Sequence, residues 1–251
     1  MSIERADGRS LSQLRPITIE RGISRYAEGS AFIKWGNTHV LCTATVEEKV
    51  PPFMRGTGKG WVTAEYSMLP RSTHQRMQRD SSKGKINGRA SEIQRLIGRS
   101  LRAAVDMDAL GERSILIDCD VIQADGGTRT ASITAGCIAL IDSLRYLVSS
   151  EKLSVIPVKT QIAAVSAGKV AGSVMIDLCY EEDSSAEADP NIVMTSAGNF
   201  VEIQGTGEAG TFSRAELDEI INLGWSGIQE LHKIQANALA LTDEEKGLMT
   251  I

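Results

Sequence analysis

The stretch DCDVIQADGGTRTASITA at 118–135 constrains this 251-residue chain more than any other. Its apolar pattern predicts a buried strand over 115–122 and a long helix over 131–148, joined by a polar turn at 123–130. The turn region carries two glycines, one arginine (Arg129) and three hydroxyl residues (Thr128, Thr130, Ser132). Backbone N–H groups at a helix start, hydroxyls and a guanidinium together suit a small anion such as phosphate. The alternative interpretation of the same residues is an ordinary strand-to-helix connection with favourable N-cap residues.

The chain is long enough to bury a substantial core, in one large domain or two small ones. Its polar amino terminus, MSIERADGRS, lacks the apolar segment of a signal peptide, and no apolar run approaches the length of a membrane span. We therefore expect a cytoplasmic protein with no membrane partner. The four cysteines form no C-x-x-C pair, which predicts free thiols in a reducing compartment.

Basic residues are concentrated in residues 50–90. This segment has eight Lys and Arg against two acidic residues, whereas the rest of the chain has 19 basic and 30 acidic residues. Such asymmetry predicts a local polyanion-binding surface on an acidic body. A solvated or salt-bridged loop is the alternative. Residues 71–89 show no clear periodicity, so the sequence predicts a mobile basic loop there.

Two segments of similar design each precede a helical region. Residues 15–48 contain alternating strands with a hairpin signal at Gly36-Asn37, and 161–183 contain two strands around a glycine-bearing turn. Helices are predicted over 92–105 and from a capping box at Ser213–Glu216 to about Leu241. These patterns predict one α+β domain over 1–241, with repeated halves at about 1–150 and 151–241 and a seam near 151–160. A frayed tail is expected at 242–251.

An acidic run follows the predicted strand that contains Asp177. Five carboxylates fall within nine residues: Glu181, Glu182, Asp183, Glu187 and Asp189. Oxygen ligands on a loop between strands suit Mg²⁺ or Mn²⁺, and a solvated charged turn is the alternative. An anion pocket, a basic surface and a divalent-metal candidate are the elements that phosphodiester chemistry needs.

Seven strings of this sequence resemble the ribonuclease PH family, phosphate-dependent 3′→5′ exoribonucleases that trim transfer-RNA precursors. The strings are RADGR, QLRPITI, EGSAFIKWGNTHVLCTATVE, VPPFMRGTGKGWVTAEYSMLPRST, INGRASEIQRLIGRSLRA, IDCDVIQADGGTRTASITAG and YEEDSSAEADPNIVMTSAGNFVEIQGTGE, and they cover nearly the whole length. The resemblance implies two pseudo-repeated βαβα halves related to a ribosomal-protein-like module. It also implies a homohexamer built as a trimer of dimers.

The resemblance also implies roles for individual residues. The phosphate site would fall on Arg89, Gly127, Thr128 and Arg129. The catalytic and metal-binding carboxylates would be Asp183 and Asp189, with Asp177 as a third candidate. The RNA-contacting arginines would be Arg71, Arg76 and Arg79. The one unusual feature of these motifs is Pro190, because a proline directly after Asp189 could change how that side chain reaches the site.

The implied reaction is phosphorolysis of RNA 3′ ends, with inorganic phosphate as co-substrate and Mg²⁺ or Mn²⁺ as cofactor. Precursor transfer RNA and other RNA 3′ ends would be the substrates, nucleoside diphosphates the products, and nucleotide addition the reverse reaction. A non-catalytic RNA-binding ring subunit of an exosome-like assembly is the alternative. A hydrolytic metal nuclease would not need a separate phosphate pocket. A small-molecule phosphotransferase is disfavoured by the basic loop and by the missing nucleotide-binding glycine loop.

Overall fold

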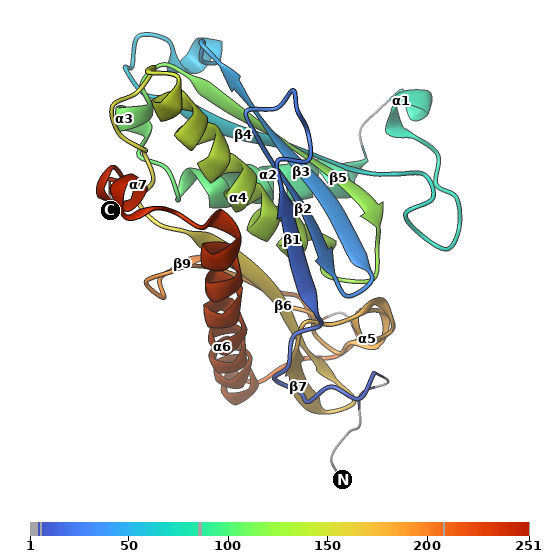
Figure 1. Ribbon diagram of the computed structural model, residues 1–251. Helices are drawn as coiled ribbons and strands as arrows, with labels where there is room; N and C mark the ends of the chain where they lie inside the picture. The colour runs from blue at the N-terminus through green and yellow to red at the C-terminus, as the bar shows by residue number, and fades with distance from the viewer. Residues whose placement is uncertain (1–4, 6, 85–86, 208, 251) are drawn as a thin grey trace.

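The computed structural model describes residues 5, 7–84, 87–207 and 209–250, which form two sheets and two helical layers (Figure 1). The larger sheet contains β1 (Ile17–Arg21), β2 (Gly29–Trp35), β3 (Thr38–Glu47), β4 (Trp61–Met68) and β5 (Ser114–Gln123). Its strand order is β1-β2-β3-β5-β4. Neighbouring strands are antiparallel except for β4 and β5, which pair in parallel. The predicted hairpin at Gly36-Asn37 is confirmed, since Trp35 pairs with Thr38.

Helix α4 (Thr128–Ser149) lies between the two sheets and contacts β2, β3 and β6. It is apolar on every side because it is covered on every side. Among the described residues it is the one helix long and apolar enough to cross a membrane, and 78% of its apolar window is buried inside the protein. The expectation that no apolar run approaches that length is therefore wrong for α4, which is a core helix here.

Helix α2 (Gly88–Arg102) packs against β4 and α4. It begins four residues before the predicted start, because the side chain of Asn87 caps it by accepting a hydrogen bond from the backbone N–H of Arg89 at 3.0 Å. This cap places Arg89 in the first helical turn. The short helix α3 (Met107–Leu110) then leads into β5.

The smaller sheet contains β6 (Ile162–Val170), β7 (Ser173–Ile176), β8 (Asn191–Thr195) and β9 (Phe200–Gln204). Its order is β7-β6-β8-β9, and every pair is antiparallel. Helix α6 (Arg214–Leu239) packs against β6, β7 and β8, with the predicted capping box formed by Ser213 and Glu216. Strand β6 contacts both α4 and α6. The layers are therefore, in order, the larger sheet, helices α2 and α4, the smaller sheet and helix α6. The α+β class is confirmed.

Three segments are more ordered than the sequence suggests. The basic segment contains β4, a 3₁₀ turn at Pro52–Met54 and the short helix α1 (Asp80–Lys83), so its longest irregular stretch among the described residues is the loop at 69–79. The acidic run forms α5 (Tyr180–Ser185). The expected frayed tail contains α7 (Asp243–Gly247), which has its own capping box, and Met249 pairs with Ile156. Local hydrogen bonds and this bridge, which periodicity does not reveal, hold these segments in place.

The four cysteines are free thiols, as predicted. Cys42 and Cys119 lie opposite each other on β3 and β5, and Cys137 lies on α4; all three are buried. Cys179 is half-buried at the start of α5. Burial raises the pKa of the Cys137 thiol to about 11, so this thiol stays protonated at neutral pH.

Candidate active site

A cavity of about 550 Å³ opens where the two halves of the chain meet. The first turn of α4, the 69–79 loop and the start of α2 line it from the first half, and α5 and the start of β8 line it from the second. Seven of the residues that the sequence selected lie here: Arg76, Arg89, Gly127, Thr128, Arg129, Asp183 and Asp189. The cavity therefore combines the cationic and the acidic candidates in one space.

The glycine turn brings the first half against the second. Gly126 and Gly127 both have positive φ, 72° and 65°, a region that favours glycine. A Cβ on Gly126 would lie against the carbonyl oxygen of Leu178 and 2.8 Å from the carbonyl carbon of Cys179. Only glycine permits this approach. The turn is also held by Thr38, whose hydroxyl donates to the carbonyl of Gly126 at 2.6 Å.

The turn presents the amino end of a long helix to the cavity. Gly127 is the N-cap of α4, and among the described residues no side chain makes a capping hydrogen bond there. Uncapped N–H groups at the positive end of a 22-residue helix are suited to binding an anion. This arrangement supports the phosphate interpretation of the turn over an ordinary connection, because an ordinary helix start usually carries a capping side chain.

The three hydroxyl residues of the turn do different things. Thr128 Oγ1 lies 2.9 Å from the buried hydroxyl of Tyr66, and Thr128 lines the cavity. Thr130 and Ser132 donate instead to the carbonyls of Gly127 and Thr128 inside the helix, at 2.9 and 2.8 Å. Both are buried, so the interpretation of these two hydroxyls as anion ligands is wrong.

Tyr66 supports the turn from β4. Burial raises the pKa of the Tyr66 phenol, while the hydrogen bond to Thr128 and the positive charges of Arg89 and Arg129 oppose the shift. The phenol therefore remains protonated at neutral pH and fixes the position of the threonine hydroxyl.

Arg129 is held along one edge of its guanidinium group. Its Nη1 donates to Gln204 Oε1 at 2.8 Å and to Glu92 Oε1 at 3.2 Å. Gln204 Nε2 donates to the same Glu92 oxygen at 2.7 Å. Among the described residues, every hydrogen bond of the Arg129 side chain uses Nη1. Nε and Nη2, the edge that binds an oxyanion with two parallel hydrogen bonds, are left for a ligand.

Arg89 supplies the second charge. It is exposed in the first turn of α2, and its guanidinium makes no hydrogen bond within the described part of the chain. Like Arg129, it lines the cavity. Two guanidinium groups and a helix amino terminus thus converge, and a phosphate group is the ligand that this chemistry fits.

Asp183 on α5 and Asp189 before β8 face the same cavity, and both are half-buried. Two other carboxylates of the acidic run are already committed to ion pairs. Glu182 pairs with Arg5 at 2.6 Å, and Glu187 pairs with Lys169 at 3.0 Å. No group of three or more His, Cys, Asp or Glu side chains that could hold a metal ion occurs among the described residues. Two aspartates beside a phosphate site still fit Mg²⁺, which takes one or two carboxylates plus water and substrate oxygens.

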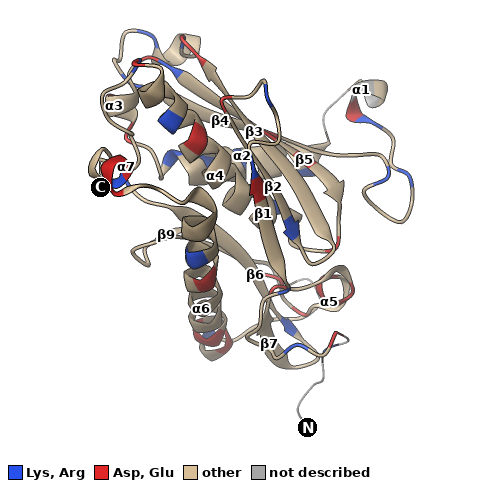
Figure 2. Cartoon of the chain, viewed as in Figure 1, with Lys and Arg blue, Asp and Glu red and all other residues tan. Residues whose placement is uncertain are grey.

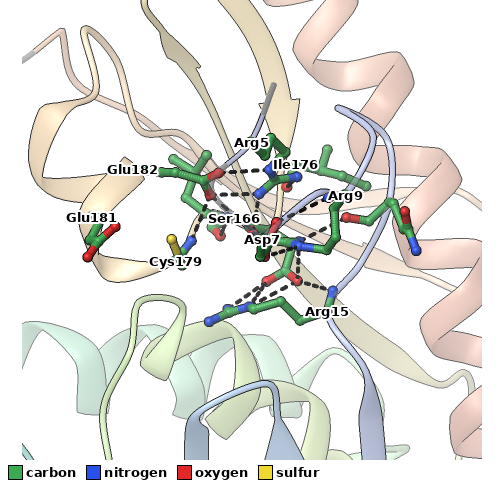
Figure 3. Close-up of polar contacts among 12 residues, drawn as sticks. Arg5, Asp7, Arg9, Arg15, Ser166, Ile176, Cys179, Glu181 and Glu182 are labelled. Atoms are coloured by element: carbon green, nitrogen blue, oxygen red, sulfur yellow. Dashed lines mark hydrogen bonds and ion pairs between the residues drawn. The ribbon is translucent and has the colours of Figure 1, made fainter. Parts of the chain in front are cut away.

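Asp177 is held by arginines and does not line the cavity. It follows the end of β7 with φ 54°, so it does not continue the strand as the sequence suggested. Its carboxylate accepts hydrogen bonds from the backbone and guanidinium of Arg15, from Trp35 Nε1 at 2.9 Å and from Arg9 at 3.2 Å. Arg5, Arg9 and Arg15 converge on this region (Figure 3). These contacts give Asp177 a structural role that ties the amino-terminal segment to the second half.

The Arg15–Asp177 pair stabilises this junction through charge. Burial by itself disfavours the charged guanidinium, but the adjacent carboxylate outweighs it and raises the pKa of Arg15. Arg15 also donates to the carbonyl of Asp125 in the glycine turn. The same ion pair therefore supports the turn that carries the candidate phosphate site.

The three loop arginines face three different hollows. Arg76 lines the main cavity. Arg71 lines a neighbouring hollow of about 770 Å³ beside Arg15 and Asp125, and Arg79 lines one of about 360 Å³ beside Arg89. Figure 2 shows basic residues along the loop that leads into α1 and acidic residues on α5. The loop therefore carries positive charge around the cavity entrance.

Sequence reasoning did not assign several residues in or behind this site, among them Tyr66, Glu92, Ser166, Asn191 and Gln204. Glu92 and Gln204 orient Arg129 although they lie 112 residues apart. Both occur inside the matching strings, but an isolated Glu or Gln carries no local signal of its role. Tertiary proximity alone reveals these contacts.

Fold and site together define an α+β protein of the ribonuclease PH type, with an anion site and a carboxylate pair at the junction of two halves. Residues 13–145 match domain 1 of the 3′ exoribonuclease family, and residues 160–227 match domain 2. The chain belongs to the 3′ exoribonuclease family.

Solved structures with the same fold include subunits of exosome assemblies. Rice (Oryza sativa) Rrp46 is 20% identical with a TM-score of 0.76, over 94% of this chain and 100% of that one. A chain of the Archaeoglobus fulgidus exosome with RNA bound to the active site is 22% identical, with a TM-score of 0.79 over 92% of each chain. A chain of an archaeal exosome core is 21% identical, with a TM-score of 0.73 over 92% of this chain and 91% of that one. At these identities the likeness establishes the fold.

Proposed function

We propose that the chain is a phosphorolytic 3′→5′ exoribonuclease that trims the 3′ ends of transfer-RNA precursors and other RNAs. One observation carries the proposal. A single cavity is lined by three arginines, a helix amino terminus and two aspartates, and Arg89 and Arg129 are the two arginines beside that helix end. A nuclease that used water as its nucleophile would need the carboxylates but no second anion site.

In this proposal Arg89 and Arg129 hold inorganic phosphate against the N–H groups at the start of α4. A phosphate oxygen forms a bond to the phosphorus of the last phosphodiester, and the bond from that phosphorus to the O3′ of the preceding nucleotide breaks. The departing O3′ takes up a proton; donation of that proton by Asp183 is the alternative to a metal-binding role for this carboxyl group. The products are a nucleoside diphosphate and an RNA shorter by one nucleotide. Because one phosphate bond replaces another, the same site adds nucleotides from diphosphates.

Asp183 and Asp189 are the residues that would hold Mg²⁺ or Mn²⁺. When bound, the ion would neutralise negative charge on the reacting phosphate oxygens. Pro190 follows Asp189 and is buried, so it restricts the backbone next to that carboxylate. Arg71, Arg76 and Arg79 would hold the RNA body, since salt-dependent contacts to its backbone do not depend on sequence.

A non-catalytic RNA-binding ring subunit is the second candidate, favoured by the likeness to exosome subunits. Either function is compatible with a ring, and we propose a homohexamer in the cytoplasm for the enzyme. The side chains of the cavity support catalysis, because Arg89, Arg129, Asp183 and Asp189 line one cavity.

Product identity tests the proposal. Purified protein is incubated with a 3′-extended transfer RNA and Mg²⁺, with and without phosphate, and the released nucleotides are separated. Diphosphates that appear only with phosphate are expected. Monophosphates released without phosphate would contradict phosphorolysis, and no release under either condition would favour the non-catalytic subunit.

Arg129→Ala is expected to abolish diphosphate release while the oligomeric state is unchanged. Arg95→Ala is the matched control, because Arg95 is an exposed arginine of α2 that does not line the cavity. Equal rates in the two variants would contradict the role of Arg129.

A further inference from the structure

An exposed aromatic ring lies at the edge of the cavity with no assigned role. Tyr180 is 54% exposed, although it lines both the main cavity and the neighbouring hollow that contains Arg71. Its position is fixed through the backbone, since its N–H donates to Asp125 Oδ1 at 3.1 Å. A large exposed ring at the wall of a pocket is suited to contact with a flat ligand.

A second ring faces it from the other half of the chain. The exposed side chain of His74 lies in the 69–79 loop, with its ring centroid 6.4 Å from that of Tyr180 and an angle of 55° between the planes. His74 lines the same two hollows. The pair therefore stands on the boundary between the main cavity and its neighbour.

Helical spacing connects Tyr180 to the reaction. Tyr180 and Asp183 are three residues apart on α5, so they share one face of that helix with about 5–6 Å between their Cβ atoms. In a nucleotide, the base and the phosphate are joined through a single sugar, so they too are close neighbours. A base stacked on Tyr180 would thus leave its phosphodiester beside Asp183.

We propose that Tyr180, assisted by His74, is the platform on which a base flanking the scissile phosphate stacks. This inference rests on the proposed function, because it requires an RNA 3′ end in the cavity. Every base has a flat π face, so such a platform accepts all four nucleotides and positions the strand without reading its sequence. This property suits an enzyme that removes successive nucleotides.

The test measures stacking directly. RNAs carrying the fluorescent base 2-aminopurine at the last, the second-last or an internal position are bound to the protein with Mg²⁺ and without phosphate. Wild type and Tyr180→Phe are expected to quench the fluorescence at one of the two end positions, and Tyr180→Leu is expected to lose this quenching. RNA affinity should fall roughly 5- to 150-fold in Tyr180→Leu, the range for one stacked base. Tyr26→Leu is the control, because Tyr26 is 85% exposed and lies outside these cavities.

An RNA that lacks the base at the quenched position provides the second arm. Wild type should bind this RNA more weakly than intact RNA, by the same factor by which Tyr180→Leu weakens binding of intact RNA. Tyr180→Leu should bind the RNA that lacks the base no more weakly than wild type does. Quenching that persists in Tyr180→Leu would contradict the proposed stacking role of Tyr180. So would a loss of RNA affinity that is larger for the combined changes than for either change alone. So would a changed oligomeric state of Tyr180→Leu, which would assign the ring to subunit packing.

Diphosphate release is measured on the same preparations. Quenching that depends on Tyr180, without diphosphate release by wild type, would reject the proposed function and leave the platform intact. Diphosphate release by wild type, with unchanged quenching in Tyr180→Leu, would reject the platform and leave the function intact.

Discussion

Replacing Gly126 with alanine tests whether the site depends on close contact between the two halves. The new Cβ would lie 2.8 Å from the carbonyl carbon of Cys179 and 3.0 Å from the backbone nitrogen of Tyr180. Since carbon atoms in contact are normally about 3.5–4.0 Å apart, the turn and α5 must separate by roughly 1 Å. A displacement of that size in a catalytic site costs on the order of 100-fold in rate.

Gly126→Ala should also lower the stability of the fold. Two effects contribute, the strain of a positive φ and the steric clash, and a control variant separates them. Alanine at φ 72° costs about 1–2 kcal/mol, and the clash with backbone adds about 1–3 kcal/mol. Gly58→Ala is the matched control, because Gly58 has φ 73° and nothing within 4 Å of the added Cβ. We therefore expect Gly126→Ala to lose about 2–5 kcal/mol of unfolding free energy in urea, and Gly58→Ala only about 1–2 kcal/mol.

Phosphorolysis rates are measured for both variants under conditions where each is folded. Gly126→Ala should be about 100-fold slower than wild type, and Gly58→Ala should be unchanged. If the two variants match in both rate and stability, backbone contact between the halves does not set the geometry of the phosphate site.

Three further changes probe other parts of the molecule. Gln204→Ala removes a hydrogen bond that fixes Arg129, so the KM for phosphate should rise on the order of tenfold while the KM for RNA stays constant; a rise in both would contradict the positioning role. Asp177→Asn leaves buried arginines without their counter-charge and should lower the unfolding free energy by about 3–5 kcal/mol, whereas Asp108→Asn, which breaks an exposed ion pair, should have little effect. Burial lowers the pKa of His232 below 6.5, although the hydrogen bond that its Nδ1 donates to Gln235 Oε1 opposes the shift, so the unfolded chain binds more protons near that pH. Stability should therefore fall as the pH drops from 7.5 to 5.5, and urea titrations of His232→Asn should show a shallower fall than wild type.

Local patterns in the sequence located most of the elements. The strand predicted over 115–122 is β5, and the helix predicted over 131–148 is α4. The capping box at Ser213 correctly marked the start of α6. These signals succeed because alternation, helical periodicity and capping are properties of neighbouring residues.

The sequence was less informative where long-range contacts override local pattern. The acidic run looked like an open loop, yet α5 forms there and Glu182 pairs with Arg5, 177 residues away. Asp177 looked like part of a strand and a third candidate metal ligand, yet Arg9, Arg15 and Trp35 surround it. Such partners cannot be inferred from spacing, because their approach depends on how the two sheets pack.

By itself, then, the sequence determined the strand–turn–helix unit that carries Gly127, Thr128 and Arg129, since turn glycines and helix periodicity are encoded locally. It also determined which residues have the charge to bind phosphate or a metal ion. Only the tertiary structure decided that Arg129 is fixed by Glu92 and Gln204, and that the turn lies against α5 from the other half. The physical reason is that an anion site needs converging groups at defined distances, and packing of the two halves around α4 sets those distances.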